Sequence, residues 1–139
     1  FMMQITIGEN TYDISTKLGV AVAIEKEFKQ SLVNIMQKFD RDAEIEDLLR
    51  IICLGASSDE RQSIRQNALE HWDFTDLRNA ANELLIRLSF SGTSEEVERK
   101  LDKREIGEKE KNAIREMLGL PLKPVLTQSN SSEQPIGLG

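Results

Sequence analysis

The residues DFTDLRNAANELLIRLSF, from Asp73 to Phe90, decide the fold that the sequence predicts. Their apolar side chains recur at the spacing of one helical face and form the widest apolar stripe in the chain. That stripe consists of Leu77, Ala80, Ala81, Leu84, Leu85 and Leu88. Asp73 or Thr75 can begin this helix, and Gly92 follows its end. We therefore expect it to be the central core helix.

Two shorter amphipathic helices are predicted between about residue 16 and residue 39. Apolar residues recur there every three or four positions, which places them on one side of a helix. The apolar face of the first helix consists of Leu18, Ala21, Ile24 and Phe28. Ser31 is a favourable N-cap for the second helix. The apolar face of that helix consists of Leu32, Ile35, Met36 and Phe39.

The acidic residues between positions 40 and 47 have two interpretations. As helix-start residues, Asp40 or Asp42 can cap a third helix that ends at Gly55. Its apolar face consists of Ile45, Leu48, Leu49, Ile52 and Cys53. As a calcium loop, the segment has Ile45 where the tight turn needs glycine and Ile51 where the last ligand should be glutamate. We therefore expect an acidic helix N-terminus and no bound metal.

Ser57 and Glu60 have the spacing of a capping box, which predicts the start of a fourth helix. This helix runs toward His71 and Trp72 and precedes the central helix. Its inward-facing residues are expected to be Ile64 and Leu69.

Charged residues dominate the segment that follows the central helix. Thr93 and Glu96 repeat the capping-box spacing, and thirteen of the seventeen residues from 95 to 111 are charged. Such a composition is typical of an outer, solvated helix. Gly107 interrupts the run, and a last short helix ends before Gly119. The apolar residues of this last helix are Ile114, Met117 and Leu118.

The N-terminal residues have the two-residue period of β-strands. Met3, Ile5 and Ile7 alternate with polar residues, and an extended pattern resumes after the turn residues 8–10. A two-stranded hairpin is marginal in water by itself. Its apolar face must therefore pack on helices or pair with another copy, and its edges are a candidate site of homo-oligomerisation.

The fold class that follows is mainly α: a helical bundle-like domain with a short N-terminal β-hairpin and a disordered C-terminal tail. We expect one domain over residues 2–119, with the hairpin at 2–14, and a flexible tail over 120–139. All three prolines lie in the last nineteen residues. Fixing the tail backbone costs on the order of 20 to 40 kcal/mol, whereas burying its six large apolar side chains returns roughly 9 to 18 kcal/mol.

Size and charge restrict the partners. The chain has 139 residues, 18 Lys plus Arg and 24 Asp plus Glu, and a net charge of −6. This charge opposes attraction to phosphate backbones, so we expect no nucleic-acid partner. No stretch approaches the roughly 20 apolar residues that span a bilayer, so we expect no membrane partner either.

The sequence contains no recognisable catalytic or cofactor motif. Cys53 is the single cysteine, and its apolar neighbours suggest a buried thiol. It could act as a nucleophile with His71 as its base, but no orienting Asn or Asp motif accompanies the pair. The glycines fall singly except for a pair in the tail, so no phosphate loop is present. We expect a non-enzymatic protein without cofactors.

In its layout the chain resembles the tail assembly chaperones of long-tailed bacteriophages. The resemblance rests on the order of a hairpin, a helix, a Ser-capped short helix and an acid-started helix, followed by further amphipathic helices, over roughly residues 2–118. The residues that carry it are the hairpin from Ile5 to Ile14, the run from Leu18-Gly19-Val20 to Ile24-Glu25 with Phe28, then Ser31-Leu32, and Ile45 with Leu48-Leu49.

The resemblance implies a small protein that coats the tape-measure protein before tail-tube subunits polymerise around it. It would act in the cytoplasm of the bacterial host and be absent from the mature virion. The chain would be a short form, which binds the tape-measure protein, and tail-tube protein is a further candidate partner. Helices of the tape measure would lie in an apolar groove.

Six apolar residues are candidates for that groove, on condition that they are exposed in the free protein. They are Leu48, Leu49, Ile52, Leu84, Leu85 and Leu88. Core packing is the competing role for each of them.

Two hypotheses from other classes remain open. The first is an acidic regulatory module of the antitoxin or anti-activator type, which would bind a basic effector through the mixed-charge helix at 94–105. The second is a small enzyme of unrecognised type, which would need a deep pocket with His71 or with carboxylates of strongly shifted pKa.

Overall fold

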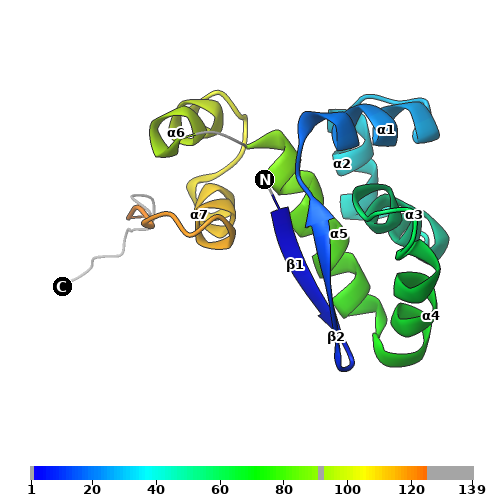
Figure 1. The fold of residues 1–139 in the computed structure, drawn as a ribbon. Helices are drawn as coiled ribbons and strands as arrows, with labels where there is room; N and C mark the ends of the chain where they lie inside the picture. The colour runs from blue at the N-terminus through cyan, green and yellow to red at the C-terminus, as the bar shows by residue number, and fades with distance from the viewer. Residues whose placement is uncertain (1, 91–92, 125–139) are drawn as a thin grey trace. The chain divides into compact units, whose positions relative to one another are not determined.

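The computed structural model describes residues 2–90 and 93–124, which form a two-stranded hairpin followed by seven helices (Figure 1). The chain divides into two compact units, Phe1–Ser91 and Gly92–Gly139, which we call the N-terminal and C-terminal units. The prediction of a mainly α-helical fold with an N-terminal hairpin is confirmed. The prediction that residues 2–119 form one domain spans both units and stays a prediction.

The N-terminal unit contains the hairpin and five helices. In chain order they are β1 (Met2–Ile7), β2 (Asn10–Ser15), α1 (Leu18–Phe28), α2 (Leu32–Arg41), α3 (Ile45–Gly55), α4 (Arg61–His71) and α5 (Phe74–Ser89). The C-terminal unit contains α6 (Ser94–Asp102) and α7 (Glu108–Met117). In the part of the chain that the structure describes, no helix combines the length and the apolar character that crossing a membrane requires.

The hairpin forms as its alternating sequence predicts. β1 and β2 are antiparallel, and Gly8 in the turn has a φ of 62°, which glycine adopts without strain. β1 contacts α4 and β2 contacts α3, so helices cover the apolar face of the sheet. The buried side chains of this face are Met3, Ile5, Ile7, Tyr12 and Ile14.

Helix α5 is the central helix of the N-terminal unit, as predicted. It packs most extensively against α3 and also contacts α1 and α2. Fully burying one leucine or isoleucine contributes about 1.5 to 3 kcal/mol relative to leaving it exposed, so this helix carries much of the core. Its buried residues are Leu77, Ala81, Leu84, Leu85, Leu88 and, outside the predicted stripe, Ile86.

Two predicted helix starts are confirmed by their hydrogen bonds. The hydroxyl of Ser31 accepts a bond from the Asn34 amide at 3.2 Å and caps α2. The hydroxyl of Thr93 accepts from the Glu96 amide at 3.2 Å, and the Glu96 carboxylate accepts from the Thr93 amide at 3.0 Å. This second pair is the reciprocal capping box expected before α6.

The predicted start of the third helix is wrong. Asp40 lies within α2, and Asp42 directly follows that helix, because α2 continues to Arg41. Helix α3 begins at Ile45 after Glu44, whose side chain makes no capping hydrogen bond. The acidic residues of its first turn still lie where the helix dipole favours negative charge.

The predicted capping box at Ser57 is also wrong. The Ser57 carbonyl accepts a bond from the Glu60 amide at 3.0 Å, and its hydroxyl donates to the Glu60 carboxylate at 3.3 Å. Both residues are thus used to close a turn that precedes the helix. Helix α4 begins one residue after Glu60, at Arg61.

Gly55 ends α3, as predicted, and a packing constraint adds to its role as a stop. A Cβ atom at this position would lie 2.6 Å from Cγ2 of Ile14, which is buried in the hairpin. Only glycine therefore allows the end of α3 to approach β2 this closely.

Three residues that were expected on inward helix faces are exposed, and one of them is Ile45 at the start of α3, with 50% of its surface exposed. Leu18, the first residue of α1, exposes 75% of its surface, and Leu69 in α4 exposes 61%. The inward face of α4 is made by Ile64 and Ala68, which are one turn apart and buried. Leu69 is five positions from Ile64, and at about 100° per residue it points to another side of the helix.

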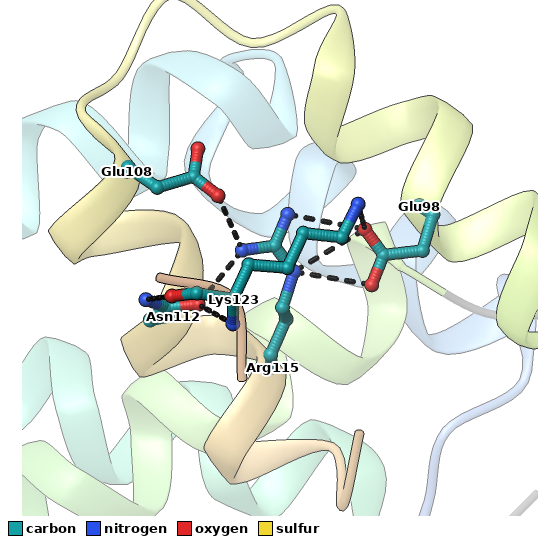
Figure 2. Close-up of polar contacts among 5 residues, drawn as sticks. All are labelled: Glu98, Glu108, Asn112, Arg115 and Lys123. Atoms are coloured by element: carbon teal, nitrogen blue, oxygen red, sulfur yellow. Dashed lines mark hydrogen bonds and ion pairs between the residues drawn. The ribbon is translucent and has the colours of Figure 1, made fainter. Parts of the chain in front are cut away.

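Arg115 is buried in the C-terminal unit with only 1% of its surface exposed, a feature that the sequence did not indicate. Figure 2 shows its polar contacts. Its guanidinium donates from Nε to both carboxylate oxygens of Glu98 at 3.2 and 3.1 Å, and from Nη2 to Oε1 at 3.1 Å. Nη1 donates to Glu108 at 2.9 Å and to Oδ1 of Asn112 at 2.8 Å. The buried charge is therefore paired and hydrogen-bonded, as burial requires.

The same cluster holds the chain that follows α7. The Lys123 amide donates to Oδ1 of Asn112 at 2.9 Å, and Nδ2 of Asn112 donates to the Lys123 carbonyl at 2.6 Å. Nζ of Lys123 lies 3.4 Å from the Glu98 carboxylate. Residues 120–124 belong to the predicted flexible tail, and its remaining residues, 125–139, lie outside the described part of the chain.

Candidate partner-binding groove

Three helix ends of the N-terminal unit meet around an apolar hollow. The first residues of α3, the last turn of α4 and the first turn of α5 line it, and its volume is about 150 Å³. We call this hollow the apolar groove. Its lining residues are Ile45, Leu49, Ala68, Leu69, Trp72, Asp73, Phe74 and Leu77.

A tight connection between α4 and α5 brings the two sides of the groove together. The Trp72 amide donates to the Ala68 carbonyl at 3.0 Å and closes α4. Asp73 then caps α5, since its carboxylate accepts from the Asp76 amide at 2.9 Å and the Asp76 carboxylate accepts from the Asp73 amide at 3.1 Å. Of the two predicted starts of this helix, the structure shows Asp73. The connection is thus only two residues long.

The groove has a buried floor and an exposed apolar rim. Leu49 and Leu77 are buried and form part of its floor. Ile45, Leu69 and Phe74 expose 50%, 61% and 45% of their surfaces. Covering the exposed half of one such side chain is worth about half of the roughly 1.5 to 3 kcal/mol of full burial, so a gathering of three is a source of binding energy.

The six residues predicted to bind a partner are all buried. None of them therefore meets the condition of exposure on which that prediction depended. Leu49 lies in the floor of the apolar groove, and Leu48 and Leu85 line a second hollow of about 180 Å³ between α2, α3 and α5. Ile52, Leu84 and Leu88 belong to the hydrophobic core, which was the competing role.

The rim residues of the groove were not selected from the sequence. The sequence predicts inward faces for Ile45 and Leu69, and it predicts no role for Phe74. A rim leucine and a core leucine have the same chemistry, so composition cannot separate them. A usable signal was the offset of Leu69 from the Ile64–Ala68 face of α4.

An ion pair lies beside the groove, between α3 and α4. Nη2 of Arg65 donates to the Glu46 carboxylate at 2.6 Å. This hydrogen bond lowers the pKa of Glu46 and raises the pKa of Arg65. Both side chains are substantially solvent-exposed, so the pair contributes little to stability.

Cys53 and His71 do not form a catalytic pair. The Cys53 thiol lies 3.7 Å from the carbonyl oxygen of Arg61, at the first residue of α4. Burial raises the pKa of Cys53, which favours the neutral thiol. His71 is the last residue of the same helix, about 15 Å further along at 1.5 Å per residue. The two groups are therefore too far apart for proton transfer between them.

The acidic segment at the start of α3 contributes to no clustered metal site. Within residues 2–90 and 93–124, no group of three or more His, Cys, Asp or Glu side chains converges as a metal site would require.

The mixed-charge helix of the regulatory hypothesis is α6, and two of its carboxylates have internal partners. Glu96 accepts the amide of Thr93 in the capping box, which lowers its pKa. Glu98 binds Arg115, and that hydrogen bond lowers the pKa of Glu98. Fewer carboxylates of this helix are therefore available to attract a basic effector.

Similarity to known proteins adds nothing to these features. No protein-family model, curated protein or solved structure matches the chain. The residues of the chain themselves therefore carry the functional inference.

Proposed function

We propose that the protein is a non-catalytic tail assembly chaperone of a long-tailed bacteriophage or prophage, which binds the tape-measure protein. The observation that carries this proposal is the apolar groove, where Ile45, Leu69 and Phe74 remain half exposed around a hollow. The order of hairpin and helices, on which the resemblance to this class of chaperone rests, is its second support.

The size of the groove favours a peptide helix over a small molecule. Its volume of about 150 Å³ is well below the roughly 300 to 1,000 Å³ typical of small-molecule sites. One or two side chains of a helix fit such a hollow, and neighbouring turns then lie on the exposed rim. This is the helix-in-groove mode, in which residues at i, i+3, i+4 and i+7 anchor the ligand.

The proposed role follows from what a long helical protein exposes before assembly. A tape-measure protein without its tube presents apolar stripes that promote aggregation. Reversible cover by many small chaperones keeps these stripes apart until tail-tube subunits replace the chaperones. The protein then acts in the host cytoplasm, helps tail-tube polymerisation and is absent from the mature virion.

Co-expression tests the proposal. The tagged protein is produced together with the tape-measure protein encoded in its genomic neighbourhood, purified, and its partners are identified and counted by native mass spectrometry. We expect one long helical chain with several copies of the chaperone.

Two variants distinguish binding in the groove from nonspecific association through any exposed apolar side chain. Leu69→Gln should lose the tape-measure protein, whereas Leu18→Gln, at another exposed leucine of the same unit, should retain it. Recovery of a small basic protein that dissociates at high salt would contradict the proposal and favour the acidic regulatory module.

A further inference from the structure

Acidic residues stand at or next to the lining residues of the apolar groove. Asp73 lines it, and the other acidic residues directly neighbour its lining residues in sequence or share the capping box of α5. These residues are Glu44, Glu46, Glu70, Asp73 and Asp76. All five are exposed, so their charges act on whatever approaches the groove.

The positive charges near the groove do not balance these carboxylates. Arg65 is bound to Glu46. Arg50 neighbours the lining residue Leu49, but it pairs with Glu27 and Asp47. Arg78 neighbours the lining residue Leu77, but it lines the second hollow. The N-termini of α3 and α5 each add about half a positive charge, and the C-terminus of α4 adds about half a negative charge. Five carboxylates against three arginines and these helix ends leave a small net negative charge around the groove, in a chain whose net charge is −6.

We propose that the apolar groove selects an amphipathic helix whose apolar stripe is flanked by Lys or Arg. The inference rests on the proposed function, in that it specifies which helices of the partner the groove takes. Apolar anchors supply the affinity by covering Ile45, Leu69 and Phe74. Basic flanks supply selectivity and a faster encounter, because oppositely charged surfaces attract each other.

The groove contains its own reporter. Trp72 is the single tryptophan of the chain and lines the hollow, so its fluorescence responds to a ligand without any label. Three tryptophan-free helical peptides of about 18 residues, long enough to hold helical structure, serve as probes. They share one leucine stripe, and their flanking positions are all Lys, all Gln or all Glu.

We expect the Lys peptide to bind at least about tenfold more tightly than the Gln peptide at low salt, and the Glu peptide to bind most weakly. In about 1 M salt, where the Debye length falls to about 3 Å, the Lys and Gln peptides should bind almost equally. The affinity that remains at high salt then comes from the leucine stripe that the peptides share.

Charge variants of the protein locate the effect. Glu44→Gln combined with Glu70→Gln should reduce the Lys preference measurably, although three of the five carboxylates remain. Neither residue makes a capping bond that this change would break. The matched control is Glu95→Gln in α6, an exposed carboxylate of the C-terminal unit, which should leave the preference unchanged. Circular dichroism confirms that each variant is folded.

Several outcomes would overturn the inference. These are equal binding of the Lys and Gln peptides at low salt, no binding of any peptide, or a Trp72 signal that depends on protein concentration alone and so indicates a second copy in the groove. None of these outcomes decides the proposed function, which the co-expression experiment tests separately. Conversely, selective binding of the Lys peptide without recovery of the tape-measure protein would support the inference and contradict the proposed function.

Discussion

The core of the N-terminal unit and the Arg115 cluster of the C-terminal unit differ in the chemistry of the side chains that they bury. The core around α5 is built from apolar side chains, and at the apolar groove part of this apolar surface stays uncovered. The C-terminal unit instead buries a guanidinium and satisfies it with Glu98, Glu108 and Asn112 (Figure 2).

The difference shows where function can lie. The guanidinium of Arg115 already binds Glu98, Glu108 and Asn112, so the Arg115 cluster is a structural device that joins α6, α7 and residue Lys123. An uncovered apolar rim gains free energy when a partner covers it. The two regions should therefore respond differently to the gain or loss of a charge.

Adding a charge to the core should have the largest effect. Leu85→Asp places a carboxylate at a site with 1% exposure, which costs about 4 to 5 kcal/mol or more and should unfold the N-terminal unit. The control is Leu18→Asp, the same change at an exposed position. Thermal unfolding followed by circular dichroism measures both, and an unchanged midpoint for Leu85→Asp would show that this position is not core.

Removing a charge from the C-terminal unit should have the next largest effect. Arg115→Ala leaves Glu98 and Glu108 without their shared cation, and breaking a buried pair costs about 3 to 5 kcal/mol. We expect the lower end, because both carboxylates keep some contact with solvent. Hydrogen exchange of the α6 and α7 amides should accelerate strongly.

Arg99→Ala, at an exposed arginine of α6, is the matched control and should change exchange little. Equal exchange rates in the Arg115→Ala variant and the wild type would show that the cluster does not hold the unit together.

Acid should weaken the C-terminal unit in a defined direction. The hydrogen bond from Arg115 lowers the pKa of Glu98 in the folded state. This contribution to stability is therefore complete above the ordinary glutamate pKa and is lost as the pH falls through the lowered value. Hydrogen exchange measured across this acid range should show the loss of stability. The Glu98→Gln variant should show a weaker dependence of stability on pH. A slope as steep in the variant as in the wild type would contradict the assignment.

The rim of the groove should be the least sensitive to substitution. Leu69→Gln should change the free energy of unfolding by less than about 0.5 kcal/mol, because 61% of the surface of this residue is already exposed. Leu49→Gln, in the floor of the same groove, should cost about 1 to 3 kcal/mol or more by burying an amide. Denaturant titrations measure the free energy of unfolding of both variants. A loss for Leu69→Gln that matches the loss for Leu49→Gln would mean that the rim belongs to the core.

Local signals made the fold predictable in this chain. The long apolar stripe of α5 and the caps at Ser31 and Thr93 act over a few residues, and the sequence displays them directly. The hairpin follows from its two-residue period. The errors at Asp40, Asp42 and Ser57 have a common cause: α3 and α4 begin after Glu44 and Glu60, neither of which makes a side-chain capping bond. A capping residue in the sequence therefore does not mark the start of these two helices.

The candidate site was much less predictable. The groove arises where the ends of α3, α4 and α5 meet, and no local pattern encodes that meeting. Arg115 binds carboxylates 7 and 17 positions away, which belong to the charged segment that was predicted to be solvated surface. Both features depend on tertiary packing that propensity and periodicity do not describe.

The central claim is that the partner lies in the apolar groove, and NMR of the complex tests it most directly. In the protein with labelled methyl groups and a labelled indole, addition of the tape-measure protein should shift the signals of Ile45, Leu69 and Trp72 most strongly. The signals of Leu18 and Leu101 should remain in place. Shifts confined to α1, to the hairpin edge or to the C-terminal unit would contradict the claim and place the binding surface elsewhere.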